Sequence, residues 1–115
     1  MGPRWRGSLP AIGRFAQHAK LRARAGKRDE LTAKFLEVCE MQRDNPACVL
    51  MLVSSSPENR DAVFLTEVWT SAEEHERARQ SSEVQAWAEQ MPSLVAGPPE
   101  VTALVIEGGK GLAAE

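Results

Sequence analysis

Residues 48–69 have the sequence CVLMLVSSSPENRDAVFLTEVW, and this stretch decides the fold. Its first six residues are all apolar, which is typical of a buried central strand. Pro57 and Asn59 lie in the polar stretch that follows, and they predict a turn. Residues 62–69 are again rich in β-branched and aromatic side chains, so the two strands are expected to form a hairpin.

A helix is predicted before this hairpin, from Lys27 to about Arg43. Apolar side chains recur there at helical spacing, at Leu31, Phe35, Val38 and Cys39. Asn45-Pro46 ends the pattern, because the residue before a proline is disfavoured in the helical conformation.

A second helix is predicted after the hairpin. The Ser71-Ala-Glu-Glu74 motif is typical of a helix N-terminus, and Ser82-Glu-Val-Gln85 repeats it. We therefore expect this helix to break near Ser81 and to begin again, with one apolar face formed by Val84, Trp87, Ala88 and Met91.

Two further strands complete the pattern. Alternation of apolar and basic residues predicts a strand over residues 15–24, ended by Gly26, and residues 101–106 predict the last strand. The order is β-α-β-β-α-β, which indicates an α+β, ferredoxin-like fold with a four-stranded antiparallel sheet and helices on one face. The other face of the sheet would be bare in a monomer, so a homodimer is predicted.

The composition fits one domain. The chain has 115 residues, of which 43% are hydrophobic and 26% charged, and no apolar run approaches the length of about 18 residues that a membrane helix needs. We expect a flexible basic N-terminal tail at residues 1–14, the domain at 15–107 and a C-terminal tail at 108–115. Residues 1–28 carry eight basic side chains and no acidic one. The acidic remainder can neutralise them, so neither nucleic acid nor a membrane is predicted as a partner.

Cofactor and metal motifs are absent from the sequence. It has no G-x-G-x-x-G and no G-x-S-x-G, and its two histidines and two cysteines are too scattered for metal-ligand spacing. Cys39 and Cys48 are expected to be buried free thiols. The N-terminus does not resemble a secretory signal, so a cytoplasmic location is expected.

The segment Thr66-Glu-Val-Trp-Thr-Ser71 carries the main candidate site. Strand alternation places Leu65, Glu67 and Trp69 on one face, where a carboxylate must be paired or hydrogen-bonded. His75 follows six residues after Trp69 and could face the same pocket. In the competing interpretation Glu67 is exposed at a strand end and His75 is a solvated helix residue.

Three short motifs together resemble the antibiotic biosynthesis monooxygenase (ABM) domain over residues 15–111. They are the stretch GKRDEL at 26–31, the stretch NPAC at 45–48, and Glu67-Val-Trp69 with Ala72 and His75. The resemblance implies a dimeric α/β barrel, in which two sheets pack face to face and each subunit has a pocket between sheet and helices. Family enzymes oxygenate phenols, anthrones or quinols without flavin, haem or metal, and Trp69 matches the Trp that lines their pocket.

The sequence also departs from parts of that family. Leu65 stands where polyketide-oxidising members have Asn, and Met51 stands where an aromatic residue is common. Haem-degrading relatives use an Asn and a His at the positions that Ala19 and Arg79 occupy here. Haem degradation is therefore not expected.

The sequence thus predicts a cofactor-independent monooxygenase that oxidises a small quinol or hydroxylated aromatic with O₂. Glu67 or His75 would be the base, and Trp69 would shape the pocket. The expected substrate-binding residues are Leu65, Met51, Phe35, Trp87 and His18. Two alternatives stay open: a non-catalytic dimeric module that binds an apolar metabolite, and an isomerase that uses the same pocket for proton transfer.

Overall fold

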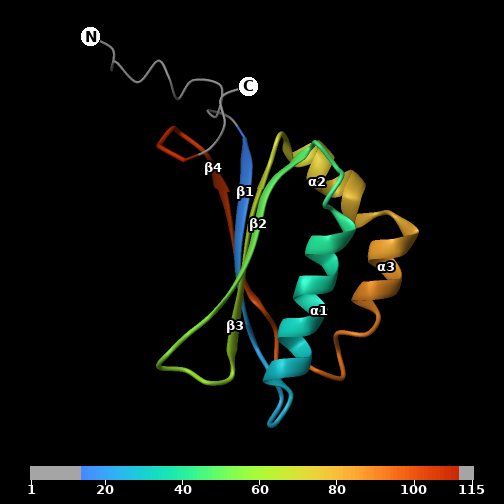
Figure 1. The fold of residues 1–115 in the computed structure, drawn as a ribbon, viewed down its shortest axis with the longest axis vertical. Helices are drawn as coiled ribbons and strands as arrows, with labels where there is room; N and C mark the ends of the chain where they lie inside the picture. The colour runs from blue at the N-terminus through green and yellow to red at the C-terminus, as the bar shows by residue number, and fades with distance from the viewer. Residues whose placement is uncertain (1–13, 112–115) are drawn as a thin grey trace.

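A computed structural model describes residues 14–111 (Figure 1). Along this part of the chain the elements are β1 (Phe15–Arg22), α1 (Arg28–Met41), β2 (Cys48–Ser55), β3 (Ala62–Trp69), α2 (Ala72–Arg79), α3 (Ser82–Ala88) and β4 (Glu100–Val105). The predicted order is confirmed, with the second helix in two pieces. The predicted flexible tail lies outside the described residues except for Arg14, and so do residues 112–115 of the C-terminal tail.

The four strands form one antiparallel sheet in the order β2-β3-β1-β4. Figure 1 shows all three helices on the same side of this sheet. The ferredoxin-like α+β fold is therefore confirmed. In the register of β1 against β3, Gln17 lies opposite Glu67 and Phe15 lies opposite Trp69, so these four side chains share the face that the helices cover.

Local sequence explains where the helices begin. The Ser71 hydroxyl accepts a hydrogen bond from the backbone N–H of Glu74 at 3.1 Å and so caps α2. The break before α3 is also confirmed, but the cap is Ser81 and not the predicted Ser82: the Ser81 hydroxyl accepts from the Val84 N–H at 3.2 Å. Before α1, Gly26 has φ +77°, a backbone conformation that favours glycine.

The core lies between α1 and the sheet. Leu31, Phe35 and Val38 of α1 are buried there against Val63 and Leu65 of β3. Full burial of one such side chain stabilises a fold by about 1.5–3 kcal/mol. Because α1 packs against β3 through these buried side chains, it forms one wall of the candidate site.

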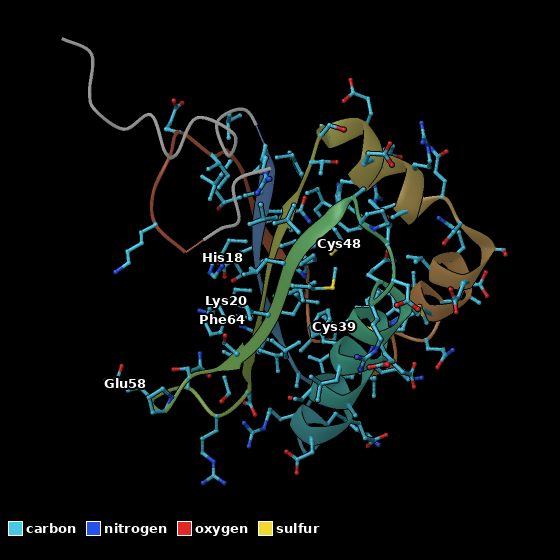
Figure 2. All side chains as sticks on the ribbon, turned by 45° about the horizontal axis from the view of Figure 1, so that its top comes forward. His18, Lys20, Cys39, Cys48, Glu58 and Phe64 are labelled. Atoms are coloured by element: carbon cyan, nitrogen blue, oxygen red, sulfur yellow. The ribbon has the colours of Figure 1, made fainter. Side chains whose placement is uncertain are left out.

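The opposite side of the sheet, which we call the bare sheet face, has no helix against it within residues 14–111. It consists of the residues that alternate with the helix-facing ones, namely Ala16, His18, Lys20, Arg22, Leu50, Leu52, Ser54, Ala62, Phe64, Thr66, Val68, Glu100, Thr102 and Leu104. Figure 2 shows His18, Lys20 and Phe64 pointing away from the helices. Leu52 and Leu104 on this face are 52% and 49% exposed. Within residues 14–111, no helix is long and apolar enough to cross a membrane.

Candidate active site

The Glu67 carboxylate lies on the helix-facing side of the sheet and is only 6% exposed. Its Oε1 accepts a hydrogen bond from Trp69 Nε1 at 2.9 Å, and its Oε2 accepts one from Gln17 Nε2 at 3.4 Å. Trp69 is two residues along β3, and Gln17 is the paired residue on β1. The sheet therefore supplies both donors that compensate for burying this carboxylate.

His75 of α2 lies beside Glu67. Its Nε2 is 3.7 Å from Glu67 Oε1, and the residue is 8% exposed. The imidazole packs between the rings of Phe15 and Trp69, with centroid distances of 4.9 and 5.5 Å. Burial lowers the pKa of His75; the charge of Arg79 lowers it further, while that of Glu67 opposes the shift. The fold therefore favours the neutral form of the imidazole.

These two side chains face a cavity of about 280 Å³ between the sheet and the helices. Four of the predicted substrate-binding residues line it, namely Leu65, Met51, Phe35 and Trp87. The Trp87 indole N–H donates to the Lys34 carbonyl oxygen at 2.6 Å, which fixes this ring against Phe35. The lining is mainly apolar, and we call the part formed by the buried Glu67 carboxylate and His75 imidazole the floor of the cavity.

The prediction for His18 is wrong. Strand alternation puts its side chain on the bare sheet face, where Nδ1 lies 3.0 Å from the Thr66 hydroxyl and the ring stacks on Phe64 (Figure 2). It is absent from the cavity lining. The interpretation with an exposed Glu67 and a solvated His75 is also wrong, because both are buried.

Gln17 and Arg79 are among the cavity residues that were not anticipated from the sequence. Gln17 lines the cavity and bonds Glu67, and Arg79 lines it from the end of α2. The signals were present: Gln17 has the same strand parity as Leu21, an apolar residue of the alternating pattern over residues 15–24. Arg79 follows His75 by four residues, which places both on one face of a helix.

The two cysteines are half-buried free thiols rather than fully buried ones. Figure 2 shows them between the sheet and α1. Burial raises the pKa of Cys48 to about 11 and also raises that of Cys39, with the Glu67 charge as the second cause in both. Both thiols are therefore protonated at neutral pH and are poor nucleophiles. Among the described residues, no group of three or more His, Cys, Asp or Glu side chains could hold a metal ion.

The family model for antibiotic biosynthesis monooxygenase matches residues 14–90. The chain belongs to the ABM family. A solved structure from Chloroflexus aurantiacus J-10-fl that carries the same family name is 31% identical, with a TM-score of 0.75 over 87% of this chain and 99% of that one. The resemblance seen in the sequence motifs is thereby confirmed.

Two solved structures of lower identity show the same fold. A protein from Caulobacter crescentus CB15 is 20% identical, with a TM-score of 0.76 over 85% of this chain and 93% of that one. Rv0793 from Mycobacterium tuberculosis is 20% identical, with a TM-score of 0.77 over 85% and 99% of the two chains. No functionally curated protein matches the chain significantly.

Proposed function

We propose that this ABM-family protein is a monooxygenase that oxidises a small quinol or hydroxylated aromatic compound with O₂ and without a bound cofactor. The observation that carries the proposal is the pair of Glu67 and His75 on the floor of an apolar cavity. To oxygenate an electron-rich ring, a protein must supply a proton acceptor and a site from which water is excluded. Membership of the ABM family supports a monooxygenase activity.

The first step is removal of a proton from a substrate hydroxyl group. A substrate hydroxyl group in the cavity can donate to His75 Nε2, which lies 3.7 Å from Glu67 Oε1. Because burial lowers the pKa of His75, the neutral form of its imidazole is favoured and can accept the proton. The nearby Glu67 carboxylate then stabilises the imidazolium that forms.

In the second step the electron-rich aryloxide transfers one electron to O₂. Superoxide and the substrate radical combine at a ring carbon, and the resulting hydroperoxide loses water to leave a new carbonyl group. For hydroquinone the balance is hydroquinone plus O₂ giving hydroxybenzoquinone plus water, so the substrate supplies all the electrons. The protein holds the ring against Trp69, excludes water and returns the proton from His75.

Oxygen uptake with a panel of hydroquinones tests this proposal. We expect uptake with at least one of them, and a decrease of about 10²–10⁴-fold in His75→Gln. His18→Gln is the matched control, since it changes the other histidine on the bare sheet face. No uptake with any quinol would contradict the proposal. Binding without turnover would favour a non-catalytic module, and rearrangement of the substrate under argon would favour an isomerase.

We further propose that two chains pair through the bare sheet face. Support comes from its exposed leucines, Leu52 and Leu104, and from the position of the helices of residues 14–111, which all lie on the other side (Figure 1). A specific interface of this kind buries about 1,000 Å² or more in total. Light scattering should give twice the chain mass of 12.6 kDa.

Substitution of two exposed leucines, one on the bare sheet face and one on α1, tests the proposed dimer interface. Leu52→Glu places a charge on the bare sheet face and should give a monomer. Leu36→Glu changes a leucine that is 55% exposed on α1 and should leave the dimer intact. A monomeric wild-type protein at micromolar concentration would contradict this pairing.

A further inference from the structure

The cavity holds one cationic side chain, Arg79, among its lining residues between 14 and 111. Three residues of α2 line the cavity, His75, Ala78 and Arg79, at positions i, i+3 and i+4. This spacing puts them on one face of the helix. Arg79 therefore belongs to the cavity-facing side of α2, one helical turn beyond His75.

The charges in the cavity are separated in space. Glu67 is buried on the floor, whereas the Arg79 side chain is 60% exposed and lies at the opening. Glu76 accepts from Arg79 Nη1 at 2.8 Å, and a guanidinium has five N–H donors in total, so this ion pair engages only part of the group. The Arg79 charge also contributes to the lowered pKa of His75.

We propose that the substrate is an anionic hydroxyarene, with its ionisable hydroxyl group at Glu67 and His75 and a carboxylate bound by Arg79. This inference rests on the proposed function and deepens it by naming the substrate class. Four residues of α-helix rise about 6 Å, which is close to the span of one benzene ring with a substituent at each end. An apolar cavity of about 150 Å³ holds benzene, so the volume of about 280 Å³ here accepts a substituted ring.

Electrostatics fix the orientation of such a substrate. A carboxylate placed on the floor would meet the negative charge of Glu67, whereas at the opening it meets the positive charge of Arg79. The apolar walls formed by Phe35, Trp87 and Leu65 then contact the ring between the two ends. The hydroxyl group that must lose its proton is consequently directed toward His75.

Isothermal titration calorimetry under argon tests the inference with a matched pair of ligands, 2,5-dihydroxybenzoate and its uncharged methyl ester. We expect wild-type protein to bind the carboxylate at least about fivefold more tightly than the ester. Raising the NaCl concentration from about 50 to about 500 mM should weaken binding of the carboxylate only.

Variants of α2 test whether the preference for the carboxylate over the ester depends on Arg79. Arg79→Gln should abolish it, and Arg79→Lys should retain part of it because the charge is kept. Arg77→Gln is the control: Arg77 lies on the same helix and also pairs with a glutamate three residues earlier, but its side chain is 75% exposed and it does not line the cavity. This variant should keep the full preference.

The inference is overturned if wild-type protein binds both ligands equally, if the preference survives Arg79→Gln, or if neither ligand binds at millimolar concentration. Because the titration is anaerobic, its outcome is separate from that of the oxygen-uptake experiment. Preference for the carboxylate without oxygen uptake would refute only the oxygenase proposal. Oxygenation of both ligands with equal KM would refute only the assignment of Arg79.

Discussion

Replacing Trp69 with Phe removes the indole N–H that donates to Glu67 but keeps an aromatic ring on the cavity floor. The lost bond is 2.9 Å long and ends on a carboxylate that is 6% exposed. A hydrogen bond to a charged group contributes about 1.5–3 kcal/mol. The smaller ring adds a packing loss of about 1 kcal/mol. We therefore expect Trp69→Phe to lower the free energy of unfolding by about 2.5–4 kcal/mol.

Trp87→Phe is the matched control for this substitution. It also removes an indole N–H bond from the cavity wall, but the acceptor is the uncharged Lys34 carbonyl. A neutral hydrogen bond contributes about 0.5–1.5 kcal/mol, so this variant should be less destabilised. Urea unfolding followed by far-UV circular dichroism measures both variants.

A double-mutant cycle then isolates the bond between Trp69 and Glu67. Glu67→Gln makes the acceptor neutral, so Trp69→Phe should cost less in that background, with a coupling of about 1–2 kcal/mol. Additivity within about 0.3 kcal/mol, or a Trp87→Phe variant as unstable as Trp69→Phe, would refute the claim that Trp69 holds the carboxylate.

Two further predictions concern α2. Burial lowers the folded-state pKa of His75 below the value near 6.5 that it has in the unfolded chain, so unfolded protein binds more protons just below pH 6.5. The free energy of unfolding should therefore fall as pH decreases from about 6.5 toward the folded-state pKa, and His75→Gln should reduce this loss. NMR titration measures the pKa of His75 directly. A value at or above about 6.5 would contradict the expected direction of the shift. Ser71→Ala removes the cap of α2 and should cost about 0.5–2 kcal/mol in urea unfolding, whereas an unchanged midpoint would show that the bond to Glu74 contributes nothing.

Much of the fold followed from local patterns in the sequence. The hairpin of residues 48–69 and the break near Ser81 could be predicted because strand and helix periodicities are short-range properties. Glu67 and Trp69 share a face for the same reason. His75 was placed correctly because it follows Trp69 closely and α2 begins at a capped serine.

Features that depend on distant pairing were harder to predict. Gln17 meets Glu67 through a register between strands that are 50 residues apart, and no local pattern sets that register. His18 was misplaced although its parity on β1 is opposite to that of Leu21, so strict alternation would have excluded it. The cavity itself depends on how α1 and α3 pack, which periodicity alone does not determine.

The most direct test of the central claim is oxygen uptake by Glu67→Gln with a quinol that the wild-type protein oxidises. Glutamine keeps the size of the side chain and can still accept from the Trp69 N–H, but it removes the negative charge beside His75. Glu73→Gln, in the exposed first turn of α2, is the control. We predict that turnover falls by about 10²–10⁴-fold in Glu67→Gln and is unchanged in Glu73→Gln. Wild-type turnover in a folded Glu67→Gln variant would contradict the account, because the carboxylate would then be structural only.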